Sequence, residues 1–354
     1  MKPHQSTETG RSMWWRSESG FTLVELMAGL VIALVIVAAG FTAMTSSNKA
    51  AQANDQAADT QQNVRLAMEL LSRDIKLAGF GMTAPVGACA TAIVPADNTP
   101  AGVDTGADSV SLVVPTTSNV APLWTLAIQA TEATGSILTL QAGAVAAMQA
   151  AGLAVNSVVS VGGAVSGTVT VIAGDVLTLA NPVGAAAVFP VGTPVYLLQC
   201  VNYAISTNPA ICGNNGPCLV RGGVAIADGI EDIQLAYACD GCNAAVNGGV
   251  ADGIADDQNG SNSFDQADFI TNNTWAAAPM TPSNIRLVQI NVVARQTRTD
   301  QGFGDTRTPA SSSAAALQVS DHNHGDDAGF NLITYQQIRR RVLTRTVQAR
   351  NLGL

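Results

Sequence analysis

Glu25 is a carboxylate in an apolar segment, and it is the only charged side chain between Ser19 and Asn48. A charged group in the hydrocarbon of a bilayer costs about 3 kcal/mol or more. Pairing with an opposite charge makes a buried carboxylate tolerable, and such a pair fixes the register of its partners more than it adds stability. Glu25 therefore predicts an ionic partner. A carboxylate that snorkels to the lipid headgroups is the alternative.

A second concentration of oxygen ligands lies in the stretch ADGIADDQNGSNSFDQAD, residues 251–268. Calcium binds carboxylate and carbonyl oxygens at this density. The spacing does not match an EF-hand loop, which closes with a glutamate at its twelfth position. Two interpretations stay open, a solvated turn and a calcium site whose candidate ligands are Asp252, Asp256, Asp257 and Asn259.

The six cysteines favour disulfide bonds in an oxidising compartment, because an even number is typical of extracytoplasmic proteins. The first expected pair is Cys212–Cys218, around a Gly-Asn-Asn-Gly-Pro loop. Cys239 and Cys242 either close a small ring or each bond further away, and Cys89–Cys200 is the third pair considered. Zinc ligation and a thioredoxin-like redox role compete with these pairings.

Few residues suggest catalysis. His322 and His324 lie in the stretch DHNHGDD, which we expect to be a polar turn because no third ligand accompanies them. Glu231 and Asp232 are adjacent on an expected strand, so their side chains point to opposite faces. Phosphate loops, nucleophile elbows and zinc-protease patterns are absent from the sequence. We therefore expect a protein that is not an enzyme and that needs no cofactor, calcium apart.

The composition points to a β-rich extracytoplasmic protein. Charged residues make up 12% of the 354 residues, and aromatic residues 5%. The net charge is −9, and because residues 1–20 carry a net +1, the rest of the chain is acidic. An acidic body argues against nucleic-acid binding through counterion release.

The elements that would hold Glu25 begin with one long helix. Residues 21–44 are almost entirely apolar, and 24 helical residues span roughly 36 Å, enough to cross a bilayer. No proline interrupts residues 21–84, and an apolar stripe at three- and four-residue spacing follows. Its members are Val64, Met68, Leu71, Ile75 and Ala78. We predict a helix over residues 21–78, whose second half packs on a folded domain.

Short β-rich runs follow Pro85. The expected strands are Asp108–Val114, Trp124–Gln129, Ser136–Leu140, Val158–Val161, Val169–Ile172, Val176–Leu179 and Val195–Leu198, with a short helix at Ala142–Gly152. The fold class is therefore α+β, with a long N-terminal helix packed on a large β-rich extracytoplasmic domain.

The residues Gly20-Phe21-Thr22-Leu23-Val24-Glu25 resemble the type III signal sequence of type IV pilins and type II secretion pseudopilins. This resemblance implies that a prepilin peptidase cuts between Gly20 and Phe21 and that the new N-terminus of Phe21 is methylated. It also implies that Glu25 pairs with the α-amino group of an adjacent subunit and sets subunit register. A secretory signal cut after Gly40 and an uncleaved anchor are the alternatives.

Later segments resemble PilW-like minor pilins. The resemblance rests on four stretches: Ser72–Phe80, Cys218–Tyr237, Ile285–Arg295 and Arg339–Asn351. It implies a removed cytoplasmic leader (1–20), a transmembrane and filament-core helix (21–44), an amphipathic second half (45–79) and a β-rich disulfide-containing domain (80–354). Within that domain, residues 85–200 resemble nothing recognised, and residues 201–354 carry the PilW-like pattern.

The resemblance implies a minor pilin that takes part in type IV pilus assembly at or near the pilus tip and supports adhesion or motility. The implied partners are other minor pilins, the major pilin, the prepilin peptidase, the inner-membrane assembly platform and the membrane, with no nucleic acid. The chain would lie in the inner membrane with its domain in the periplasm, and on the pilus after assembly. Alternatives are a J-type minor pseudopilin of a type II secretion system and a tip adhesin that binds through residues 85–200.

Overall fold

The computed structural model describes residues 20–99, 104–131, 135–183, 188–213, 216–298 and 316–351. The predicted leader therefore lies outside the described residues, except for Gly20. The chain divides after Asn54 into two compact units, and the division falls within the long N-terminal helix. Each unit is described by itself.

The helix α1 runs from Leu23 to Leu77, as the sequence predicted to within two residues at either end. Thr22 caps its start, because the Thr22 Oγ1 accepts the backbone N–H of Glu25 at 3.2 Å. Gly79, in the left-handed conformation at φ 78°, follows its end. Asn351 also supports this end, because its Nδ2 donates to the carbonyl oxygen of Lys76 at 3.2 Å.

The first unit contains the apolar half of α1. Its large apolar side chains are exposed from Phe21 to Met44. In the part of the chain that the structure describes, α1 is the one helix long and apolar enough to cross a membrane. Exposure of this half of the helix to water is therefore unfavourable, and contact with lipid or with other apolar helices is favourable.

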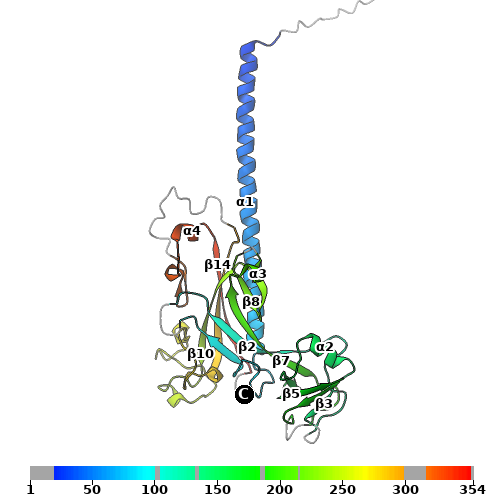
Figure 1. The fold of residues 1–354 in the computed structure, drawn as a ribbon. Coiled ribbons are helices and arrows are strands. Elements are labelled where there is room, and N and C mark those ends of the chain that lie inside the picture. The colour runs from blue at the N-terminus through cyan, green and yellow to red at the C-terminus, as the bar shows by residue number, and fades with distance from the viewer. Residues whose placement is uncertain are drawn as a thin grey trace, which may run out of the picture. The chain divides into compact units, whose positions relative to one another are not determined.

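The second unit is built on a nine-stranded sheet (Figure 1). Its strand order is β1-β2-β7-β4-β5-β6-β3, with β8 paired to β7 and β9 to β8. All the strand pairs are antiparallel. The strands are β1 Ile93–Ala96, β2 Ser109–Thr116, β3 Ile137–Thr139, β4 Val158–Val161, β5 Val165–Ala173, β6 Val176–Leu179, β7 Val195–Ser206, β8 Cys218–Arg221 and β9 Val224–Asp228.

A three-stranded antiparallel sheet, in the order β10-β11-β14, carries the second half of the domain. Its strands are β10 Ile230–Cys239, β11 Ile285–Arg295 and β14 Arg340–Gln348, and a small hairpin pairs β12 Gln318–Val319 with β13 His322–Asn323. The remaining helices are α2 Ala144–Ala150, α3 Pro209–Cys212 and α4 Leu332–Gln336, with 3-10 turns η1 Asn247–Gly249, η2 Gln266–Asp268, η3 Pro282–Asn284 and η4 His324–Asp326.

Six of the seven expected strands between residues 108 and 198 lie in observed strands, and α2 confirms the short helix. The strand expected at Trp124–Gln129 is wrong. Thr125 and Leu126 form only isolated bridges, to Pro194 and Leu140. Trp124 and Leu126 are nevertheless buried, so this apolar run fills a core without joining a ladder.

Two hydrophobic cores organise the second unit. The predicted stripe of α1 is buried in the larger core, together with apolar residues of β1, β2, β7, β10 and β11. The smaller core lies wholly within residues 124–197 and contains the apolar face of α2. Within the region without recognised resemblance, residues 124–197 therefore pack around a core of their own, whereas β1 and β2 contribute to the larger core.

A buried ionic network joins the helix to the nine-stranded sheet. The Asp74 side chain on α1 is 2% exposed, and its Oδ2 accepts bonds from the Tyr203 hydroxyl at 2.7 Å and the Arg221 Nε at 2.8 Å. Arg73 Nη2 reaches the other oxygen at 3.1 Å. Burial and the Asp74 charge raise the pKa of the Tyr203 phenol. Because every partner is polar and paired, this network fixes how the helix seats on β7 and β8.

All six cysteines are paired as the sequence analysis considered them, in Cys89–Cys200, Cys212–Cys218 and Cys239–Cys242. The first bond spans 111 residues and ties the segment after α1 to β7. Closing so long a loop restricts the unfolded chain most, which in the chain-entropy account is the main source of disulfide stabilisation.

We predict that Asp74→Asn lowers the free energy of unfolding by about 3 kcal/mol, because it leaves the guanidinium of Arg221 without its buried counter-charge. Urea denaturation of the full chain in detergent measures the change. Arg73→Gln is the matched control, since the Arg73 side chain is 60% exposed and its ion pair contributes at most about 1 kcal/mol. Equal losses in both variants would contradict the network's role.

Candidate functional site

The N-terminal segment places the predicted processing residues ahead of the helix. Gly20, Phe21 and Thr22 precede α1 and are exposed, and a Cβ added at Gly20 would meet no atom within 4 Å. Glu25 lies in the first turn of α1, where its carboxylate is also exposed. The described residues thus give no packing reason for a glycine at position 20, whereas the N-terminal turn of α1 favours a carboxylate at position 25.

The surroundings of Glu25 define what that carboxylate can do. Leu23, Val24, Leu26 and Met27 flank it, and all four are exposed. Wherever these side chains become covered, Glu25 is carried into the same apolar environment. An anion there can hold a cation from another molecule in a fixed position, because within the first turn of α1 no basic side chain accompanies it.

The acidic loop after β10 uses its carboxylates to bind backbone amides. Asp256 is buried and accepts the N–H groups of Gly241, Cys242 and Asn243 at 2.7–3.2 Å. Asp257 is half-buried and accepts four consecutive backbone N–H groups, those of residues 259–262. Burial acts to raise the pKa of Asp257, but these four hydrogen bonds together outweigh it and lower the pKa.

The other two candidate calcium ligands also cap turns. The Asp252 Oδ1 accepts the N–H of Ile254 at 3.0 Å, and the Asn259 Oδ1 accepts that of Ser261 at 2.8 Å. Within the described ranges, the groups of three acidic or imidazole side chains that converge within 4.8 Å lie elsewhere. Calcium in this loop stays a prediction, and the geometry accounts for its carboxylates as organisers of an irregular backbone.

The expectation that His322 and His324 form a polar turn is wrong, because both imidazoles are buried. The His322 Nδ1 lies 3.0 Å from the Asp232 Oδ2, and its Nε2 lies 2.8 Å from the Asp327 Oδ1. His324 stacks on His322 with 4.6 Å between ring centroids, and its Nε2 lies 3.3 Å from the same Asp232 oxygen. Asp232 comes from β10, some 90 residues away in sequence.

This histidine cluster, Asp232, His322, His324 and Asp327, is an ion-pair network. Burial alone would lower the pKa of His322, but the hydrogen bonds and charges of Asp232 and Asp327 outweigh burial and raise it to about 9. Burial opposes the charge of Asp232 as well, yet the two imidazoles lower its pKa to about 2. Both ring nitrogens of His322 already face carboxylates, so it is held as an imidazolium that joins the β12–β13 hairpin to β10.

Glu231 and Asp232 have separate ionic partners, and a β-bulge between Ile230 and Asp232 interrupts the strand alternation on which the prediction of opposite faces rested. Glu231 pairs with Arg340 of β14 and lies 3.8 Å from Arg295 Nε on β11, whereas Asp232 is buried beside the imidazoles. The two carboxylates therefore serve separate ion pairs and cannot act as one acid–base pair.

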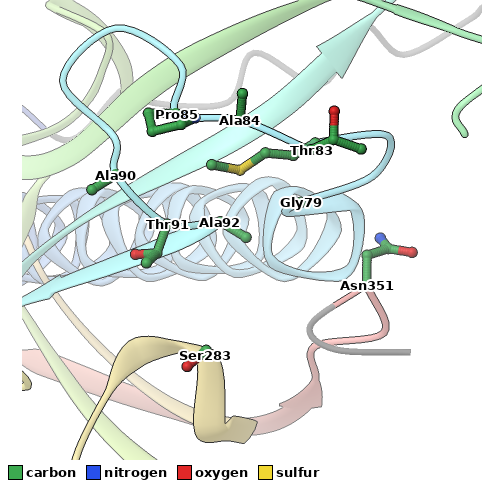
Figure 2. A pocket seen from close by; sticks show the side chains of 10 residues that line it. Gly79, Thr83, Ala84, Pro85, Ala90, Thr91, Ala92, Ser283 and Asn351 are labelled. Carbon is green, nitrogen blue, oxygen red and sulfur yellow. The ribbon is translucent and has the colours of Figure 1, made fainter. Parts of the chain in front are cut away.

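An open cavity of about 290 Å³ lies at the C-terminal end of α1 (Figure 2). The segment after the helix contributes Gly79 and Thr83, the approach to β1 contributes Thr91, and Ser283 and Asn351 complete the lining with small apolar residues. None of the lining residues is acidic, basic, a histidine or a cysteine. The cavity thus offers hydroxyl and amide groups and no side chain suited to acid–base chemistry or strong metal ligation.

We predict that His322 makes the domain less stable at high pH. Its pKa is raised from 6.5 to about 9, so the stability from its charge is fully present below pH 6.5 and is lost as pH rises through 9. The loss is on the order of 3 kcal/mol.

Urea midpoints at pH 6 and pH 9, in buffer with a chelator, measure this loss. We expect His322→Gln to show a smaller decline between the two pH values than the unchanged chain, and Asp326→Asn, an exposed neighbour, to retain the full decline. The same decline in all three proteins would contradict the assignment.

Comparison with known proteins gives two family matches. Residues 203–351 match the family model for type IV pilus-assembly protein W, and residues 15–41 match the prokaryotic N-terminal methylation motif. No curated protein and no solved structure matches the chain. The first match contains Tyr203, Arg221, Asp232 and both imidazoles of the histidine cluster, and the second contains Gly20, Phe21 and Glu25.

The matches agree with the fold: an apolar N-terminal helix carrying a methylation motif leads into a β-rich domain whose second half matches the pilus-assembly model. These families are structural and not enzymatic, and they imply association with the membrane and with other pilus components. Over residues 15–41 and 203–351, the two matches support a PilW-like, type IV prepilin-like protein.

Proposed function

We propose that this pilus-related minor pilin takes part in the assembly and initiation of a type IV pilus, at or near its tip, and so supports adhesion or motility. The observation that carries the proposal is the apolar half of α1, with exposed side chains from Phe21 to Met44 and one carboxylate among them. These apolar side chains must be shielded from water, by the bilayer before assembly and by neighbouring helices in the filament afterwards.

Processing precedes assembly in this proposal. A prepilin peptidase at the cytoplasmic side of the inner membrane cuts between Gly20 and Phe21, and Phe21 becomes the N-methylated first residue. Support comes from the match to the methylation motif and from the position of the bond, in exposed backbone just before the helix begins. The β-rich domain then lies in the periplasm, and it reaches the pilus surface after assembly.

Glu25 acts after processing. Cutting after Gly20 creates a cationic amino group at Phe21, and the carboxylate of one subunit pairs with this group of the next. In low dielectric, a misplaced subunit leaves both charges unpaired, so the pair selects the correct register. Partners in this step are other minor pilins, the major pilin and the inner-membrane assembly platform.

A J-type minor pseudopilin of a type II secretion system is the second candidate, because the same N-terminal chemistry serves both machines. Deletion of the chain separates the two: loss of surface pili with normal secretion of folded exoproteins supports the pilus role, and the reverse supports secretion. A tip adhesin that binds through residues 85–200 is the third candidate, and the hydrophobic core formed wholly within residues 124–197 supports a folded surface in that region.

We predict that Gly20→Glu blocks leader removal without changing the fold, because a side chain at position 20 meets open space and only the peptidase requires a small residue there. Immunoblotting of membrane fractions would show a product heavier than the mature chain by the leader. Gly29→Ala is the matched control, since a Cβ at Gly29 also meets nothing within 4 Å. Normal processing of Gly20→Glu would overturn the cleavage assignment.

We predict that Glu25→Ala is inserted and processed normally but lowers pilus number about tenfold or more, because an unpaired amino group remains in the filament core. Electron microscopy of surface pili, combined with immunoblotting for the processed chain, measures both steps. Glu69→Ala serves as the control, because Glu69 is an exposed acid further along the same helix. Pilus numbers unaffected by Glu25→Ala would remove the register argument.

A further inference from the structure

Three carboxylates converge where the loop between β1 and β2 meets the β12–β13 hairpin. Asp97 follows β1, Asp108 precedes β2, and Asp104 lies between them and bridges to His322. One oxygen atom from each of the three lies within 4.8 Å of the others. Asp321, next in sequence to His322, lies close enough for its charge to raise the pKa of both Asp97 and Asp104.

The hydrogen bonds of this acidic group are incomplete. Asp108 accepts the N–H groups of Asn98 and Leu235 at 3.0 and 2.8 Å, and Asp97 accepts those of Thr99 and Asn273 at 2.9 and 3.2 Å. Asp104 is 0% exposed, yet neither of its oxygens has a hydrogen-bond partner among the described residues. The Asp321 Oδ2 is a third carboxylate oxygen that is buried without a partner among the described residues.

Buried like charges in this number are costly unless something neutralises them. Burial and the charges of Asp321 and Asp97 raise the pKa of Asp104 to about 6, and burial raises that of Asp108 to about 8. The nearest opposite charge is His322, whose two ring nitrogens already face Asp232 and Asp327. Both ring nitrogens of His322 are thus engaged by other carboxylates, whereas the acidic group lacks a counter-charge of its own.

We propose that Asp97, Asp104 and Asp108, with Asp321 beside them, bind one divalent cation, and that this cation is calcium. The ligands are all carboxylate oxygens, which hard cations prefer and which disfavour zinc or copper. The ligands come from irregular backbone around a loop, an arrangement that suits the flexible coordination of calcium better than the strict octahedron of magnesium.

The position of the ion gives it a structural task. Asp108 also bonds β10, through the N–H of Leu235 and its own N–H to the carbonyl of Ile233. An ion held by Asp104 and Asp321 therefore joins the β1–β2 loop, the sheet of β10 and the β12–β13 hairpin at one point. This site is separate from the N-terminal segment, and its occupancy does not depend on the proposed pilus function.

Terbium luminescence tests the proposal on the full chain in detergent after treatment with a chelator. Tyr237 is buried on β10, two residues beyond Leu235, whose N–H bonds Asp108, so its ring is placed to sensitise bound terbium. We expect saturable emission on excitation at the aromatic band, displacement by calcium chloride, and a calcium-dependent rise in Tm of about 5 °C. Magnesium chloride should displace terbium more weakly, and equal displacement would overturn the choice of calcium.

Two variants locate the ion. Asp104→Asn should weaken terbium and calcium binding at least about tenfold while the chain stays folded, because the substitution removes one ligand charge and also relieves buried repulsion. Asp257→Asn is the matched control, since it changes an acid of the other predicted calcium region. Unchanged binding in Asp104→Asn with loss in Asp257→Asn would overturn the proposal in favour of the loop. No terbium emission in the unchanged chain would overturn it altogether.

Discussion

The apolar half of α1 carries one carboxylate, and the chain offers it no cation in the first turn of the helix. This single charge constrains everything else that the first unit can do. In water the surface around Glu25 would aggregate, and in lipid or protein the carboxylate requires a partner. A freed amino group on a neighbouring chain satisfies both conditions at once. On this account, the Glu25 carboxylate has no ionic partner in the isolated chain and gains one, the amino group of a neighbouring chain, on assembly.

The second unit fixes the C-terminal half of α1 in position. The apolar stripe of α1 packs into the larger core, and a buried ionic network sets the position of the helix on the sheet. The Asp74 carboxylate receives a phenol from β7 and a guanidinium from β8, so the helix cannot rotate without leaving buried charges unpaired. Asn351 adds a bond to the last turn. The residues that gave the resemblance to PilW-like pilins, in Ser72–Phe80 and Cys218–Tyr237, thus meet in space at this seat.

Local patterns predicted the local structure well. The period of Val64, Met68, Leu71 and Ile75 identified the buried face of α1, and alternating β-branched runs identified most strands. The failures share one physical cause, which is dependence on distant partners. The sequence pattern of His322 and His324 suggested a polar turn because Asp232, which lies beside both imidazoles, is 90 residues earlier in the sequence. Trp124–Gln129 read as a strand because burial alone produces the same apolar pattern as a ladder.

The acidic group on the β1–β2 loop was equally hidden, since Asp97, Asp104 and Asp108 have no motif spacing and their burial depends on β10 and the β12–β13 hairpin. By contrast, the density of aspartates after β10 attracted a calcium prediction, and the structure shows those side chains bonded to backbone amides. In that loop the aspartates organise turns, and calcium there stays a prediction, whereas buried oxygens without hydrogen-bond partners, which only the fold reveals, mark the site that we propose on the β1–β2 loop.

Mass spectrometry of the N-terminus of the chain purified from pili tests the central claim most directly. The account predicts a first residue of N-methylated phenylalanine, Phe21, which places the cationic amino group one helical turn before Glu25. A mature chain that begins at Met1 would leave Glu25 without that amine. A mature chain that begins after Gly40 would lack Glu25 itself. Either result would contradict the account.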